Sequence, residues 1–130
     1  MIAGNEGGVP GPSLMPGTIS TRRRIAHGET IMVQEIAQID VKPGLEEQFE
    51  AGVKKATPIF QRAKGCRGME LQRSIENPRR FRLVVQWETV ENHTVDFRGS
   101  PDFQEWRKLV GHCFEAPPAV EHTHQVVKGF

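Results

Sequence analysis

The chain has 130 residues, enough for one domain and a terminal extension, and its formal net charge of +1 excludes a general attraction to nucleic acid or anionic membranes. Its two cysteines, Cys66 and Cys113, are too few and too far apart for a disulfide framework, and no apolar run reaches the roughly 18 residues of a membrane span. We therefore expect a reduced, cytoplasmic protein that binds neither membranes nor nucleic acid.

The first 30 residues differ in composition from the rest of the chain. They are rich in Gly and Pro and have no apolar periodicity, which predicts a disordered leader. Residues 31–130 are predicted to form the folded domain. Met32 is an alternative start for the folded part, because the ordered pattern begins there.

The first half of the predicted domain reads as a strand followed by a helix. Residues 31–41 alternate as a strand, although Glu35 interrupts the apolar positions. Apolar residues then recur at helical spacing from Leu45 to Phe60, opposite a face of Glu and Lys. Pro58 lies within this helix, so we predict a kink or a break near Thr57.

The second half reads as two strands, a helix and a last strand. Residues 69–76 and 81–88 alternate on either side of Asn77-Pro78, which predicts an antiparallel hairpin. Ser100 and Pro101 have the residue types preferred at the N-cap and the first position of a helix. The apolar stripe of that helix comprises Phe103, Trp106, Val110 and Cys113, and the last strand is predicted over residues 120–128.

The element order β-α-β-β-α-β predicts an α+β protein of the ferredoxin-like type. Its four-stranded antiparallel sheet would carry two helices on one face. The uncovered face would then hold a mixture of Ile36, Gln38, Val84 and Gln86, which is too apolar to lie comfortably in water. We expect a second copy to cover this face, giving a homodimer with an enclosed, partly polar cavity.

The order and spacing of four segments resemble the antibiotic biosynthesis monooxygenase domain family. The segments are KPGLEEQFEAGVKKATPIFQRAKGCRGMEL, FRLVVQWETVENH, FRGSPDFQEW and PPAVEH, and the resemblance covers nearly all of residues 31–128. It implies a dimeric α+β barrel. It also implies a monooxygenase that uses molecular oxygen on an aromatic or quinone-like small molecule in the dimer cavity, without metal or flavin. The alternative is a non-catalytic ligand-binding or structural dimer of the same fold.

Three residues near the third predicted strand are candidate catalytic groups. Trp87 could hold a flat ring and orient one of its oxygens, or it could simply fill the core. His93 could take a proton from a phenol or quinol near neutral pH, or it could be an exposed histidine at a helix start. Arg98 could stabilise an oxyanion, or it could form a surface ion pair with Asp96 or Asp102.

Three further residues are candidate substrate contacts. Arg73 lies among apolar residues of its strand, either at an edge or reaching into a cavity. His122 and His124 share one face of the last predicted strand and would line the dimer cavity. With His112 they could instead form a three-histidine metal site, but we predict no metal and no cofactor.

Overall fold

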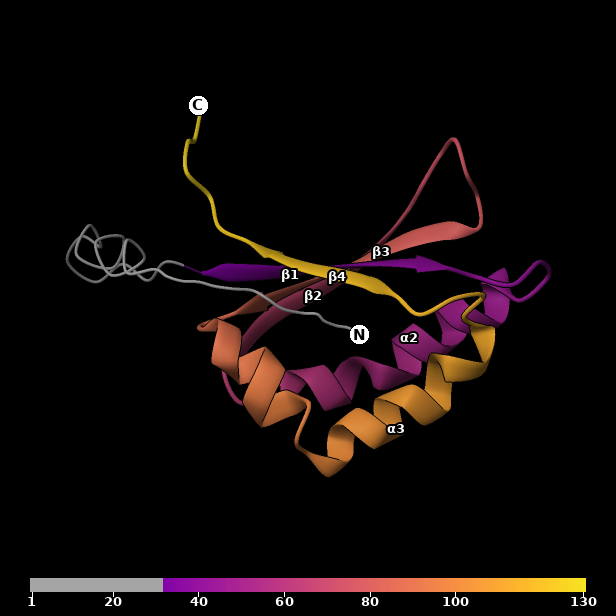
Figure 1. The fold of residues 1–130 in the computed structure, drawn as a ribbon, viewed down its shortest axis with the longest axis horizontal. Coiled ribbons are helices and arrows are strands. Elements are labelled where there is room, and N and C mark those ends of the chain that lie inside the picture. The colour runs from indigo at the N-terminus through magenta and orange to yellow at the C-terminus, as the bar shows by residue number, and fades with distance from the viewer. Residues whose placement is uncertain (1–31) are drawn as a thin grey trace.

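The structure, a computed structural model, describes residues 32–130, and the predicted leader lies outside the described residues. The elements are β1 (Val33–Asp40), α2 (Glu46–Gln61), β2 (Cys66–Arg73), β3 (Arg80–Trp87), the π-helix η2 (Asn92–Phe97), α3 (Pro101–Val110), the 3₁₀ turn η3 (Gly111–Cys113) and β4 (Ala119–Thr123). Figure 1 shows the helices gathered on one side of the sheet. The predicted ferredoxin-like α+β fold is therefore confirmed. No helix within residues 32–130 is both long and apolar enough to cross a membrane.

The sheet has the strand order β2-β3-β1-β4, and every neighbouring pair is antiparallel. β2 and β3 form the predicted hairpin across the turn at Asn77-Pro78. β1 and β3 are the central strands of the sheet. β4 lies at one edge beside β1 and β2 lies at the other edge beside β3.

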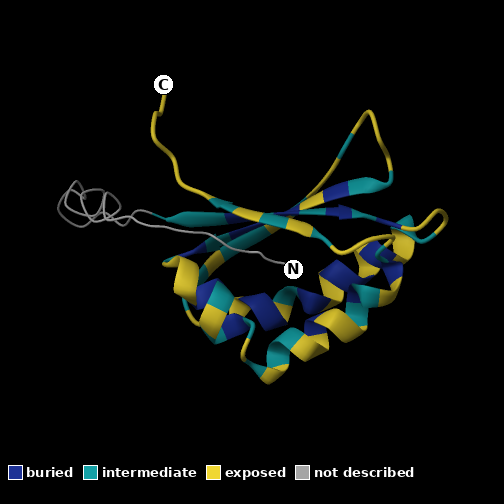
Figure 2. Ribbon diagram, viewed as in Figure 1, coloured by how far each residue is buried: buried dark blue, intermediate teal, exposed yellow. Residues whose placement is uncertain are grey.

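The core lies between the sheet and the helices, as Figure 2 shows by the buried residues on facing surfaces of both layers. The predicted alternation of β3 is confirmed, because Phe81, Leu83, Val85 and Trp87 are all almost completely buried. Phe60 from α2 packs edge-on against Trp106 from α3, with their ring centroids 5.2 Å apart. The remaining large members of this core include Ile39, Val41, Phe49, Val53, Ile59, Phe97, Val110 and Cys113.

Pro58 does not break the first helix, so of the predicted kink or break near Thr57 the break is wrong. α2 continues through Pro58 to Gln61. Pro58 lies in the last turn, where its missing N–H removes one backbone hydrogen bond close to the helix end. The next two residues, Ile59 and Phe60, are buried in the core. Their burial, at about 1.5–3 kcal/mol for each large apolar side chain, holds the last turn in place.

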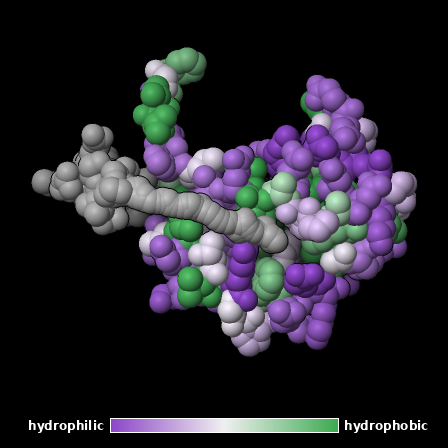
Figure 3. Space-filling view, viewed as in Figure 1, coloured by the Kyte–Doolittle hydropathy of each residue, from purple (hydrophilic) through white to green (hydrophobic). Residues whose placement is uncertain are grey.

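β4 is shorter than predicted and ends at Thr123 instead of continuing to residue 128. It pairs with β1 as far as the Gln34–Thr123 pair, one residue from the start of β1 at Val33, so its later residues have no partner on β1. The segment that follows is exposed, and Figure 3 shows this end of the chain as a group of apolar side chains projecting from the body. Its exposed apolar residues are Val126, Val127 and Phe130.

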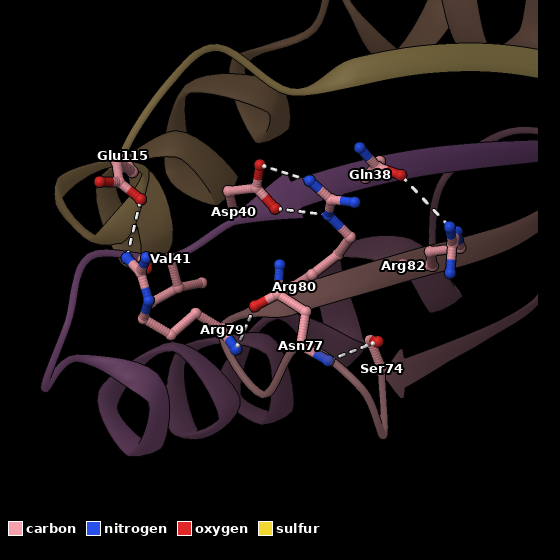
Figure 4. Close-up of polar contacts among 9 residues, drawn as sticks. All are labelled: Gln38, Asp40, Val41, Ser74, Asn77, Arg79, Arg80, Arg82 and Glu115. Atoms are coloured by element: carbon pink, nitrogen blue, oxygen red, sulfur yellow. Dashed lines mark hydrogen bonds and ion pairs between the residues drawn. The ribbon is translucent and has the colours of Figure 1, made fainter.

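Polar contacts join the end of β1 to the segments around it (Figure 4). The guanidinium of Arg80 donates two hydrogen bonds, of 2.9 and 3.3 Å, to the carboxylate of Asp40 across the β1–β3 pair. Arg79 donates to Glu115 at 2.8 Å and so links the β2–β3 turn to the segment after η3. These side chains are about one-third or more exposed, so they position the strand ends more than they stabilise the fold.

Truncation of Trp106 tests the helix–sheet core. Trp106→Ala removes a buried ring that packs on Phe60, and we expect a loss of about 3–5 kcal/mol in the free energy of unfolding, as is usual for large core aromatics. Chemical denaturation followed by circular dichroism measures this loss. Ile75→Ala, in the exposed β2–β3 turn, is the control and should change the stability by less than about 0.5 kcal/mol. Equal stabilities for the two variants would place Trp106 outside the core.

Candidate functional site

A carboxyl group, that of Glu35, lies inside the core near the start of β1. Glu35 is on the face of β1 that packs against the helices, in line with Ala37 and Ile39, and it is only 6% exposed. The indole Nε1–H of Trp87 donates a hydrogen bond of 3.0 Å to its Oε1. Nε2 of His93 lies 3.4 Å from the same oxygen. A ring nitrogen from β3 and a ring nitrogen from η2 therefore both lie next to one carboxyl oxygen.

His93 lies on a π-helix, η2, that the sequence patterns did not predict. The region between β3 and α3, for which no helix or strand was predicted, winds into η2, and wide turns of this kind are rare and often occur at functional sites. His93 and Phe97 both point into the core from η2. The imidazole of His93 is 3% exposed and stacks on the ring of Trp87, with 5.5 Å between the centroids and 20° between the planes.

The first residue of η2 is held by a network of its own. The side chain of Asn92 accepts a hydrogen bond from the backbone N–H of Thr89 at 3.1 Å and donates one to Asp96 at 3.1 Å. Gly65, in the turn before β2, has a φ of 79° and packs against this amide. A Cβ at Gly65 would overlap with Asn92 Oδ1, so only glycine fits both the backbone conformation and the space.

His122 extends the cluster to the edge of the sheet. It stands opposite Glu35 in the register between β4 and β1. Its Nε2 lies 2.9 Å from Nδ1 of His93, and the ring is only partly buried. Glu35, His93 and His122 therefore form a continuous line of polar groups from the core to the edge strand, and we call this line the Glu35–His122 line.

Two contacts, the His93–His122 hydrogen bond and the 3.4 Å approach of His93 to Glu35, determine the tautomers of the line once the charge of Glu35 is given. When Glu35 is a carboxylate it can only accept, so His93 must carry its proton on Nε2. Nδ1 of His93 then accepts, and His122 must donate from Nε2. This arrangement leaves Nδ1 of His122 as an unprotonated acceptor at the outer end of the line.

Burial sets the protonation states of the three groups. It raises the pKa of Glu35 to about 7, although the Trp87 hydrogen bond and the charge of Arg98 oppose the shift. Burial lowers the pKa of His93 to about 3, helped by the charges of His122 and Arg98. Burial and then Arg98 also lower the pKa of His122. At neutral pH both imidazoles are neutral and the carboxyl group titrates, which suits proton transfer.

Arg98 lies at the end of η2, close enough for its charge to act on all three members of the line. The carboxylates that were alternative partners for it in a surface ion pair have other contacts. Arg62 donates hydrogen bonds of 2.8 and 2.9 Å to Asp102, and Asn92 donates one to Asp96. The positive charge of Arg98 therefore favours an anion at the site and opposes a second cation.

The other predicted site residues do not join the line within one protomer. Arg73 is exposed, contacts Glu50, and lies 5.2 Å over the ring of Phe81 beside a groove of about 630 Å³ between α2 and β2. His124 is exposed beyond the end of β4, because that strand stops earlier than predicted. His112 contacts Gln48 at 3.2 Å.

The three histidines that could have formed a metal site are not brought together. His122 bonds to His93, whereas His112 lies on η3 beside α2. Within the Glu35–His122 line, His93 turns different nitrogens towards its two neighbours, so the three groups do not converge on one point. Among residues 32–130 there is no group of three His, Cys, Asp or Glu side chains arranged to hold a metal ion.

Sequence reasoning selected Trp87, His93 and His122 but assigned no role to Glu35. The available signal was that Glu35 interrupts the apolar alternation of its strand. The contact between His93 and His122 depends on the β1–β4 register and on the path of η2, and neither follows from apolar periodicity.

Comparisons with known proteins agree with this fold and cover most of the site. The family model described as "Antibiotic biosynthesis monooxygenase" matches residues 32–109, which include Glu35, Trp87 and His93. The uncharacterised protein YczJ of Bacillus subtilis (strain 168) is 40% identical over 95 residues, or 73% of this chain and 100% of YczJ.

Solved structures extend the comparison. A crystal structure from Bordetella bronchiseptica, described as a "Putative antibiotic biosynthesis monooxygenase", is 62% identical with a TM-score of 0.74, and the match covers 75% of this chain and 100% of that one. Rv0793 from Mycobacterium tuberculosis is 21% identical with a TM-score of 0.62, covering 76% of this chain and 99% of that one. At that identity the likeness to Rv0793 shows the fold alone.

The buried carboxyl predicts a specific dependence of stability on pH. Because the pKa of Glu35 is about 7 in the folded chain and near 4.5 when unfolded, its contribution favours folding below pH 4.5 and is lost as the pH rises to about 7. Glu35→Gln removes this contribution. The unfolding free energy of the variant minus that of the parent should therefore rise between pH 4.5 and about 7 and level off above it.

Urea denaturation at a series of pH values measures this difference. Glu105→Gln, on the exposed side of α3, is the control and should follow the parent throughout. A Glu35→Gln difference that does not change with pH would mean that the carboxyl has an ordinary pKa.

Proposed function

The chain belongs to the antibiotic biosynthesis monooxygenase family, and we propose that it is a cofactor-independent monooxygenase acting on an aromatic, quinol-like small molecule. The Glu35–His122 line is the observation that supports this function best. It offers a neutral imidazole at the sheet edge, hydrogen-bonded to a second neutral imidazole and backed by a carboxyl that titrates near neutral pH. The independence from metal and flavin is inferred from the family.

The proposed reaction needs one proton acceptor and an environment that tolerates an anion. Removal of a proton from an electron-rich ring carbon or hydroxyl gives an anion that can donate electrons to molecular oxygen. For a ring CH₂ group, oxygen adds to the carbon as a peroxide, the O–O bond breaks, and the products are a ring carbonyl and water. The substrate supplies all the electrons, so the overall change R₂CH₂ + O₂ → R₂C=O + H₂O balances without another reductant.

Each predicted residue has a role in this scheme. The His93–His122 pair accepts the proton, and Arg98 stabilises the substrate anion through its charge. Trp87 is completely buried and its N–H is bonded to Glu35, so we assign it to positioning His93 and the carboxyl. Arg73 and His124 would contact substrate only where a second copy of the chain brings them to the site.

We further propose that the chain forms a homodimer through the open face of the sheet. On this face Ile36 pairs with Val84, and the polar pairs Gln34–Gln86 and Gln38–Arg82 stand on either side of them. The helices lie on the other side of the sheet (Figure 1), and at this apolar centre Ile36 stays partly exposed among residues 32–130. A symmetric partner would bury it and enclose the sheet edges that border the site.

A charge placed at the centre of this face tests the dimer. Sedimentation equilibrium of the parent should give twice the chain mass at micromolar concentration. Ile36→Glu should give the single-chain mass, because a buried carboxylate without a partner opposes association. Gln104→Glu, on the exposed side of α3, adds the same charge and should leave the dimer intact. A monomeric parent, or a dimeric Ile36→Glu variant, would contradict the proposed interface.

Oxygen uptake tests the reaction. The parent protein, treated with chelator and stripped of flavin, is incubated with a panel of phenols, quinols and anthrones, and oxygen consumption is recorded. We expect turnover of at least one member. His93→Gln should lower the rate by about 10²–10⁴-fold, the usual cost of losing a general base. His112→Gln, an exposed histidine outside the line, should retain the parent rate.

Three other results would redirect the proposal. If no member of the panel is oxidised, the alternative of a non-catalytic binding dimer replaces the enzyme. If chelator abolishes the activity and a metal restores it, the reaction is metal-dependent. If His93→Gln is as active as the parent while circular dichroism shows that it is folded, the base lies elsewhere.

A further inference from the structure

The Glu35–His122 line joins a group at the sheet edge to a group in the core through contacts that alternate between the nitrogens of each ring. His122 uses Nε2 towards His93, and no hydrogen bond within residues 32–130 engages its other nitrogen at the outer end. His93 uses Nδ1 towards His122 and Nε2 towards Glu35. A proton arriving at one nitrogen of a ring can therefore leave from the other, which is the arrangement that a proton relay requires.

We propose that Glu35 is the final acceptor of the proton taken from the substrate, and that the proton reaches it from His122 through His93. This inference rests on the proposed function, because it assigns the path of the proton that the reaction removes. Within the line, only His122 takes the proton directly from the substrate. Glu35 touches neither substrate nor oxygen, and it acts by holding the proton at the inner end of the line.

The transfer balances without creating charge in the core. The substrate gives a proton to Nδ1 of His122, whose Nε2 proton passes to Nδ1 of His93. The Nε2 proton of His93 passes to Oε1 of Glu35. The site begins with a buried carboxylate and ends with a substrate anion at the sheet edge, so one negative charge has moved outward. Stopping the proton on His93 would instead leave a carboxylate and an imidazolium buried side by side.

The same path supplies the proton that the second half of the reaction needs. After oxygen adds to the substrate anion, the product is a peroxide anion. Glu35 returns its proton through the two histidines to that peroxide. The remaining C–H bond of that carbon then breaks together with the O–O bond, the released proton joins the departing hydroxide to give water, and the ring carbonyl forms. Glu35 and both histidines end in their starting states, ready for the next substrate.

The surrounding groups support a neutral pair of histidines and a titrating carboxyl. Arg98 opposes positive charge on either imidazole and favours an anion within its reach. Cys66, at the start of β2, feels the charge of Glu35, and burial together with that charge raises the pKa of its thiol, so it stays protonated. Trp87 can only donate. The distance of 3.4 Å between His93 and Glu35 must shorten for transfer, as catalytic contacts often do when substrate binds.

The relay makes a prediction that can be measured without substrate. In the full-length protein labelled with ¹⁵N-histidine, long-range ¹H–¹⁵N spectra report which nitrogen of each ring is protonated. Above pH 7 both His93 and His122 should be protonated on Nε2. As Glu35 takes up a proton near pH 7, both rings should change to Nδ1–H together, and an infrared band of a neutral carboxyl group should appear with the same midpoint.

Glu35→Gln separates the relay from a structural role. The amide oxygen of Gln can take the place of Oε1, the one oxygen that both Trp87 and His93 contact, and it cannot take up a proton, so both histidines should keep their Nε2–H tautomers at every pH. Because the line then has no final acceptor for the proton, the rate of oxygen uptake should fall by about 10²–10⁴-fold and lose its pH dependence near 7. Glu105→Gln, on the exposed side of α3, should retain the parent tautomers, rate and pH profile.

The outcomes distinguish the relay from the reaction. Full activity in folded Glu35→Gln, or a His93 tautomer that stays the same while the carboxyl titrates, would overturn the relay even if the parent is an oxygenase. Protonation of His93 to an imidazolium near neutral pH would also overturn it. A parent without turnover counts against the proposed function, and the joint change of both tautomers would then still support the path itself.

Discussion

A carboxyl group buried in a small core must either receive hydrogen bonds from donors or remain protonated, and Glu35 places this requirement on several elements at once. The indole N–H of Trp87 on β3 donates a hydrogen bond to this carboxyl group, and the imidazole of His93 on η2 lies against it. Arg98, at the end of η2, acts on it through its charge. These groups are far apart in sequence and meet only because the first half of β1 lies between β3 and β4. The polar line is therefore built into the packing of the domain.

The π-helix connects this polar line to the apolar core. Its wide turn lets His93 and Phe97 face inward together. Phe97 packs against Trp87, Phe60 and Phe103, with ring centroids 5.0–5.7 Å apart, so the backbone that carries His93 is anchored on both helices and on β3. Packing of this kind fixes the position of His93, so that only its 3.4 Å distance to Glu35 has to shorten when a proton moves.

Much of the fold could be predicted because apolar periodicity depends on which face of an element is buried. The alternation of β3 and the stripe of α3 were predicted correctly for that reason. Pro58 was misread because the burial of Ile59 and Phe60 holds the last turn of α2. The site was harder to predict. Trp87 and His93 could be selected by residue type, but the role of Glu35 depends on its neighbours across the sheet, and a charged residue in a strand does not reveal them.

The turn after α2 has a consequence for how this protein can diversify. Gly65 looks like an ordinary turn residue, yet its backbone packs closely against the side chain of Asn92, the residue directly before His93. A side chain there would push on the start of η2 and shift the imidazole relative to its two partners. The position of His93 therefore restricts which residue can stand at Gly65, although the two residues are far apart in the sequence.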